Sequence, residues 1–110
     1  MTLDDLRAWG ANVDEGLGRC MGMESFYLGL IAKTQGDASF DALNDALAAE
    51  DWKKAFEAAH ALKGVLGNLS LTPLFDPANE LCELLRPQEP VDYQPLIDTI
   101  NERLAQFKAL

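Results

Sequence analysis

The stretch from Asp51 to Leu69, DWKKAFEAAHALKGVLGNL, decides the fold of this chain. Its apolar residues recur every three or four positions, which is the spacing of one face of an α-helix. Asp51 is a suitable N-cap, because its side chain can accept a hydrogen bond from the first helical turn. We therefore predict a helix over residues 51–69 whose apolar side packs on other helices.

The only histidine of the chain, His60, lies opposite the apolar side of this helix. At about 100° per residue, Leu62 and Leu66 lie roughly 200° and 240° away from His60 around the helix axis. The residues within about 60° of the histidine around the helix axis are Lys53, Phe56, Glu57, Lys63, Gly64 and Gly67. We therefore predict that His60 is exposed and stands among lysines and glycines.

The two glycines on this face indicate a surface that another protein approaches. Each glycine in a helix interior destabilises the helix by about 1 kcal/mol relative to alanine. We therefore expect these glycines to have a role that offsets the loss of stability. Gly64 and Gly67 would leave a strip free of side chains beside the imidazole. We therefore assign both glycines to partner docking.

The other apolar patterns also have helical spacing, and no long alternating segment suggests a sheet. Helices are expected over residues 3–11, 24–34, 39–49, 77–86 and 92–108. Residues 12–23 contain three glycines and are expected to form a broken turn or a short helical piece. Residues 70–76 are expected to form a loop or single turn, because proline favours the first helical position and Pro77 would start the next helix.

These elements predict an all-α protein built as an antiparallel four-helix bundle, with the N-terminal helix capping one end. A length of 110 residues is typical of one domain, so residues 1–110 are expected to form a single unit. The sequence has no long heptad repeat that would pair with a helix of another copy, and a monomer is therefore expected.

Composition excludes several classes of function. The net charge of −9 disfavours binding to nucleic acid or to anionic lipid. Cys20 and Cys82 have no CxxC spacing, and the chain has no second histidine that could join them as a ligand. We therefore predict that both cysteines are core residues rather than metal ligands. No apolar run approaches the roughly 20 residues of a membrane span, and the N-terminus lacks the basic residues of a signal peptide. We expect a cytoplasmic protein.

An exposed imidazole is suited to phosphoryl transfer. The unperturbed pKa of imidazole, about 6.5, leaves much of it neutral near pH 7, and the neutral nitrogen can attack an acyl phosphate. Lys63, one turn along the helix, could neutralise part of the charge of the added phosphate. A general-base role in hydrolysis is less favoured, because no hydroxyl or thiol shares this face and only Glu57 could orient the ring.

The sequence resembles the histidine-containing phosphotransfer (HPt) domain. The segments that carry the resemblance are Glu24-Ser25-Phe26-Tyr27, Phe56-Glu57-Ala58-Ala59, His60-Ala61-Leu62-Lys63-Gly64, Gly67-Asn68-Leu69 and Leu71-Thr72-Pro73-Leu74. Two positions depart from the family pattern. Ser70 stands where related sequences often have glycine, and Pro77 interrupts what is commonly a continuous helix.

The resemblance implies a bundle that neither binds ATP nor phosphorylates itself and that relays phosphoryl groups between receiver-domain aspartates of two-component systems. It implies that His60 is the phosphoacceptor, that Lys63 stabilises the phosphate, and that Gly64 and Gly67 permit close docking.

The implied partners are a response-regulator receiver domain or a hybrid sensor histidine kinase. The resemblance places the Mg²⁺ needed for transfer on the receiver, so that this chain needs no metal or cofactor of its own. The alternative is a helical adaptor that binds a signalling partner without phosphotransfer. Such an adaptor would be expected to lack the histidine or the lysine, and this chain has both.

Overall fold

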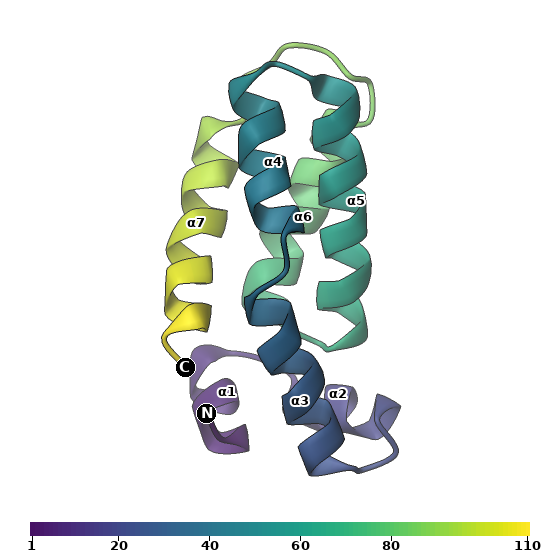
Figure 1. Cartoon of the computed structure of the whole chain (residues 1–110), viewed down its shortest axis with the longest axis vertical. Helices are drawn as coiled ribbons and strands as arrows, with labels where there is room; N and C mark the ends of the chain where they lie inside the picture. Colours follow the sequence, from purple (N-terminus) through teal and green to yellow (C-terminus); the bar gives the residue numbers. More distant parts are fainter.

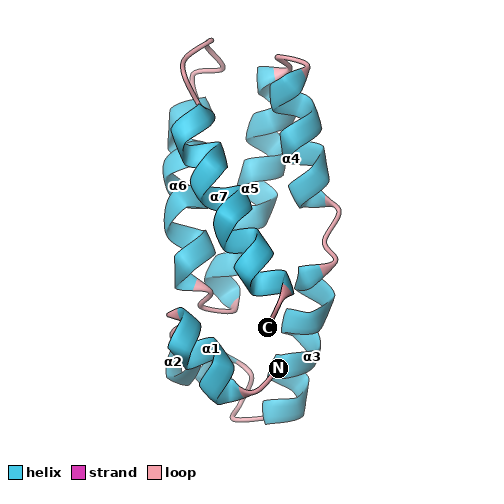
Figure 2. Ribbon diagram, turned by 90° about the vertical axis from the view of Figure 1, so that its left-hand side faces the viewer, coloured by secondary structure: helices cyan, strands magenta, loops and turns pink.

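A computed structural model describes all 110 residues and contains seven α-helices and no strand (Figures 1 and 2). The helices are α1 (Leu3–Trp9), α2 (Val13–Arg19), α3 (Glu24–Gln35), α4 (Ser39–Ala48), α5 (Trp52–Asn68), α6 (Thr72–Leu85) and α7 (Gln94–Lys108). The predicted all-α class is confirmed. None of these helices has the length and apolarity needed to cross a lipid bilayer.

Helices α4 to α7 form the predicted antiparallel four-helix bundle. The chain runs up α4, down α5, up α6 and down α7, so that α5 lies between α4 and α6 and diagonally across from α7 (Figures 1 and 2). Helix α3 continues the line of α4 beyond the break at residues 36–38, and α1 and α2 lie at the same end of the bundle (Figure 2). The turn between α5 and α6 is therefore next to the N-terminal helices.

One continuous core holds these helices together. It contains 25 buried apolar or aromatic residues, and the largest fully buried side chains include Tyr27, Leu62, Leu66, Leu81 and Phe107. Burying a leucine or phenylalanine side chain stabilises a fold by about 1.5–3 kcal/mol. The apolar side of α5 thus faces the core, as its periodicity predicts.

Helix α1 covers the end of the bundle. Thr2 and Asp5 form a reciprocal capping box at its start, with hydrogen bonds of 2.9 and 3.1 Å. Trp9 at its other end stacks on Phe107 of α7, with ring centroids 5.2 Å apart, and its indole N–H donates to Gln106. The predicted capping of the bundle by the N-terminal helix is confirmed, although the helix ends at Trp9 rather than at residue 11.

Helix α2 occupies part of the segment that was expected to be a broken turn or a short helical piece. Asn12 caps it by accepting a hydrogen bond from the backbone N–H of Glu15. Gly16 is buried, and a Cβ added there would lie 2.6 Å from both the carbonyl oxygen of Leu69 and the hydroxyl of Tyr27. This glycine therefore allows α2 to pack closely on α3 and on the end of α5.

The prediction that residues 70–76 form a loop or a single turn, and that a helix begins at Pro77, is wrong. Helix α6 begins at Thr72 and continues through Pro77 to Leu85. Proline has no N–H to donate to the carbonyl four residues earlier, which is that of Pro73. Arg103 of α7 donates to this carbonyl instead, at 2.8 Å. Because the acceptor has a tertiary partner, the helix tolerates the proline.

Candidate functional site

His60 lies midway along α5 and is exposed, so its predicted exposure is confirmed. The helix starts at the predicted cap, where Asp51 accepts a hydrogen bond of 3.1 Å from the backbone N–H of Lys54. Ala59, which precedes His60, and Leu62, on the opposite side of the helix, are both buried. The core thus anchors the helix and leaves the imidazole facing solvent.

An aromatic ring accompanies the imidazole. Phe56, one turn before His60, is half-buried, and the two ring centroids are 5.9 Å apart at an interplanar angle of 51°. The guanidinium carbon of Arg86, at the end of α6, lies 5.3 Å from the centroid of the Phe56 ring, within the range of a cation–π contact. Phe56 therefore links the histidine to a cation on the neighbouring helix.

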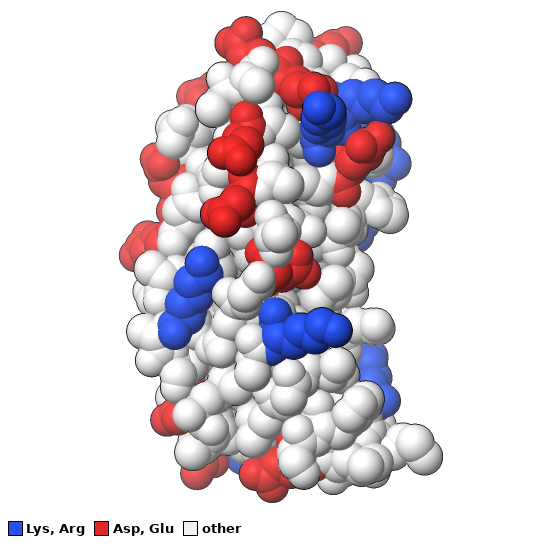
Figure 3. Space-filling model, viewed as in Figure 1, with Lys and Arg blue, Asp and Glu red and all other residues white.

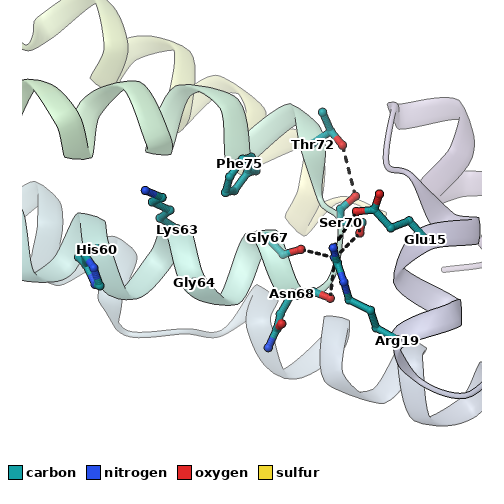
Figure 4. Close-up of a pocket in the computed structure, with 10 residues that line it drawn as sticks. All are labelled: Glu15, Arg19, His60, Lys63, Gly64, Gly67, Asn68, Ser70, Thr72 and Phe75. Carbon is teal, nitrogen blue, oxygen red and sulfur yellow. Dashed lines mark hydrogen bonds and ion pairs between the residues drawn. The ribbon is translucent and has the colours of Figure 1, made fainter.

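Lys63 follows His60 by three residues and leans toward α6, whereas His60 points away from that helix (Figure 4). The Lys63 Nζ lies 3.9 Å from Oε1 of Glu83 on α6. The same carboxylate accepts hydrogen bonds from Arg86, through Nη2 at 2.8 Å and Nε at 3.2 Å. The hydrogen bonds from Arg86, more than the charge of Lys63, hold the pKa of Glu83 below its ordinary value, so the carboxylate is ionised at neutral pH.

The predicted site residues line one open cleft of about 460 Å³ between α5, α6 and α2 (Figure 4). Its walls consist of Glu15, Arg19, His60, Lys63, Gly64, Gly67, Asn68, Ser70, Thr72 and Phe75. The structure therefore brings all four predicted residues together. It adds side chains from α2 and α6 that periodicity within α5 could not reveal.

The two glycines of the cleft have different surroundings. A Cβ added to Gly64 would meet no atom within 4 Å outside its own helix backbone. A Cβ added to Gly67 would lie 3.1 Å from Cε2 of Phe75, which is tighter than ordinary van der Waals contact. The absence of a side chain at Gly67 thus serves the packing of α6 on α5, whereas nothing inside the chain requires a glycine at Gly64.

Helix α2 closes one end of the cleft through Arg19. Its Nη1 donates to the carbonyl of Gly67 at 2.6 Å and to the Ser70 hydroxyl at 2.8 Å. Nη2 of Arg19 pairs with Glu15 at 3.1 Å, and the Ser70 hydroxyl donates to Glu15 at 2.8 Å. The last carbonyls of a helix have no donors within it, so a cation there is favourable.

Ser70 has a φ of +56°, in the left-handed region that favours glycine. The resemblance to HPt domains leads to an expectation of glycine at this position, and this backbone conformation gives a physical reason for that expectation. In this chain the buried Ser70 side chain is held by Arg19 and Glu15, which sequence reasoning did not single out. No signal in the sequence joins these residues, because they lie 51 and 55 positions apart from Ser70 along the chain.

Positive charge gathers on α5 although the protein as a whole is acidic. Lys53, Lys54 and Lys63 all belong to this helix. On the face shown in Figure 3, acidic side chains are spread widely. Several basic side chains lie toward the right-hand edge, where Figure 1 places α5, and others lie near the middle and left of the face. The surroundings of His60 are therefore more favourable to a phosphate than the net charge of −9 suggests.

The cysteines play no evident part in this cleft. Cys20 and Cys82 are both buried with free thiols, as predicted for core residues. Burial raises the pKa of the Cys82 thiol, which keeps it neutral near pH 7. No three His, Cys, Asp or Glu side chains of the chain are grouped so that they could hold a metal ion.

Residues 31–110 match the protein-family model described as the Hpt domain. The matched part includes His60, Lys63, Gly64 and Gly67 and all of α4 to α7. It begins after α1 and α2, the helix that contributes Glu15 and Arg19 to the cleft. Neither the curated proteins nor the solved structures contain a match to this chain.

Proposed function

Because this chain belongs to the Hpt domain family, we propose that it accepts a phosphoryl group on His60 and passes it to receiver-domain aspartates in a two-component phosphorelay. Histidine phosphotransfer in phosphorelays is the role of the family, whose members are phosphocarriers rather than kinases. The observation that carries the assignment to His60 is its position. It is the only histidine, it is exposed at mid-helix, and it lines the same open cleft as Lys63.

The transfer is a displacement at phosphorus. The ring nitrogen that bears no proton attacks the phosphorus of an aspartyl phosphate, and a nitrogen–phosphorus bond forms. The bond from phosphorus to the aspartyl oxygen breaks, its electron pair stays on the carboxylate, and the proton on the other ring nitrogen exchanges with solvent. The reverse sequence returns the phosphoryl group to an aspartate of a second receiver.

Lys63 is the residue proposed to stabilise the transferred group. Side chains three residues apart on a helix are neighbours, so its ammonium can turn from Glu83 toward a phosphoryl group on His60. A phosphoryl group carries up to two negative charges, which attract the ammonium more strongly than one carboxylate does. The lysine would thus lower the free energy of phosphohistidine and of the transition state that leads to it.

The proposed partner is a receiver domain, free or as part of a hybrid sensor histidine kinase. Its acidic, phosphorylated pocket is complementary to the lysines of α5. The strip at Gly64 has no side chain and no internal contact to fill it, which lets the receiver backbone approach the imidazole. The Mg²⁺ that assists transfer is expected to be bound by the receiver, and the chain is expected to act as a monomer.

The deciding experiment is to incubate the protein with a receiver domain charged by a small acyl phosphate and to follow the label. Label on this chain that is acid-labile and alkali-stable, and that is absent from His60→Gln, supports phosphotransfer. The variant should stay folded because the side chain is exposed. Absence of label from several receivers, with a folded protein, would favour the adaptor without phosphotransfer.

A further inference from the structure

Glu83 of α6 links two cations beside the histidine face, Lys63 and Arg86. Its carboxylate lies 3.9 Å from the Lys63 Nζ and accepts two hydrogen bonds from Arg86. Arg86 in turn packs on the ring of Phe56, whose centroid is 5.9 Å from that of His60. The five side chains therefore form a chain of contacts that starts at Lys63 and ends at His60, both on α5.

Lys63 points to the side of α5 on which Glu83 lies. In Figure 4 the lysine extends toward α6, whereas the imidazole of His60 points to the opposite side of α5. The carboxylate of Glu83 lies on the lysine's side, 3.9 Å from its Nζ. At 3.9 Å the pair has ionic attraction without a short hydrogen bond, and the Glu83 side chain is 54% exposed. Such a surface pair contributes little to stability, so a stronger anion nearby can take the lysine from it.

We propose that Glu83 is a positioning residue that competes with the phosphoryl group on His60 for Lys63, and so makes phospho-His60 a better donor to the receiver. This inference rests on the proposed function, because it assumes that His60 carries the phosphoryl group and that Lys63 contacts it. In the free protein Glu83 holds the lysine toward α6. After phosphorylation the lysine must leave Glu83 to reach the phosphate, and the carboxylate repels the new negative charge.

The consequence concerns the position of the transfer equilibrium. Competition by Glu83 weakens the stabilisation of phospho-His60 and therefore shifts phosphate toward the aspartate of the receiver. Removing the charge of Glu83 frees Lys63 and removes the repulsion, and phospho-His60 should then accumulate. Arg86 loses its carboxylate partner in the same substitution and becomes a second free cation on this face.

The test compares Glu83→Gln with Glu102→Gln in the full chain. Glu102 is exposed on α7, across the bundle from α5, so its substitution changes the net charge equally without touching the chain of contacts from Lys63 to His60. Each protein is mixed with a phosphorylated receiver, and the equilibrium ratio of phosphohistidine to aspartyl phosphate is measured. We expect Glu83→Gln to raise this ratio about two- to fivefold, the range of an exposed ion pair, and Glu102→Gln to leave it unchanged.

A second variant shows whether Glu83 acts through the lysine. In the Lys63→Ala background the effect of Glu83→Gln should fall toward that of Glu102→Gln. In the unsubstituted protein, NMR signals of the Glu83 carboxyl carbon and of the Lys63 ε-methylene should shift together on phosphorylation, because the pair separates. If Glu83 contributed only to folding, neither the dependence of the ratio on Lys63 nor these NMR signals would change.

The outcomes separate this inference from the proposed function. Failure to label His60 in the unsubstituted protein overturns both. A labelled protein in which Glu83→Gln and Glu102→Gln give the same ratio overturns the role of Glu83 alone. An effect of Glu83→Gln that persists in full without Lys63, or a Glu83 signal that phosphorylation leaves in place, overturns it as well.

Discussion

Phe75 of α6 fills the space where a side chain on Gly67 of α5 would lie, with its ring 3.1 Å from the position of an added Cβ. One turn earlier, Gly64 has no such neighbour within 4 Å. Both glycines line the cleft beside His60. The fold therefore requires a small residue at Gly67, whereas only an external partner could require one at Gly64.

This difference predicts opposite effects of alanine at the two positions. Gly64→Ala should raise the free energy of unfolding by about 1 kcal/mol, because alanine is the better helix former and the added methyl group meets no protein atom. Gly67→Ala brings the same gain in helix propensity, but the added methyl group would overpack against Phe75. Overpacking typically costs about 1–3 kcal/mol, so we expect no net stabilisation. Urea unfolding measures both values. Equal stabilisation by the two substitutions would contradict the packing argument.

A larger side chain at Gly64 should weaken receiver binding while the bundle stays folded. Gly64→Leu places a leucine on the cleft surface next to His60, and we expect at least a tenfold loss of affinity, about 1.4 kcal/mol. The matched control is Gly29→Leu on α3, since an added Cβ there also meets nothing within 4 Å and the residue does not line the cleft. Calorimetric titration with the receiver measures both. Unchanged affinity for Gly64→Leu would remove this glycine from the docking surface.

The hydrogen bond from Arg103 to the Pro73 carbonyl predicts coupling between Arg103 and Pro77. Arg103→Met should lower the free energy of unfolding by about 1–2 kcal/mol, because a partly buried carbonyl loses its donor. In the Pro77→Ala background an N–H is again available to that carbonyl, so Arg103→Met should cost less. A double-mutant cycle in urea measures the coupling. Strictly additive effects would show that Arg103 does not substitute for the missing N–H.

The burial of the Tyr27 hydroxyl leads us to predict that the protein loses stability at alkaline pH. Tyr27 is buried, its hydroxyl donates to the Leu69 carbonyl at 2.8 Å, and burial raises its pKa above the ordinary value. The unfolded chain therefore loses this proton first as the pH rises above about 10. The folded state then binds more protons, so the free energy of unfolding falls with increasing pH.

Tyr27→Phe tests this assignment. At pH 7 it should cost about 1 kcal/mol or more, because the Leu69 carbonyl loses its donor. Above about pH 10 its stability should fall less steeply than that of the unsubstituted protein. Burial also raises the pKa of Tyr93, so part of the slope should remain in the variant. Parallel pH profiles would exclude Tyr27 as a source of alkaline unfolding.

The spacing of apolar residues along the chain was sufficient to predict much of the fold and the residues of α5 that line the site. The apolar period of α5 predicts which residues face the core, and that periodicity alone places His60 on the exposed side with Lys63, Gly64 and Gly67 nearby. These inferences succeed because the direction of a side chain around a helix depends only on its position in that helix. The structure confirms the exposure and the shared cleft.

Sequence by itself thus determined the helical class, the antiparallel bundle and the face on which the histidine lies, because these follow from periodicity and short connections. Tertiary structure alone decided the rest. Helix α6 passes through Pro77 because Arg103, on another helix, supplies the missing donor. Arg19 reaches the end of the cleft from α2, and only Phe75 distinguishes Gly67 from Gly64. Each of these outcomes depends on a partner far away in the sequence, and spacing along one helix carries no information about such partners.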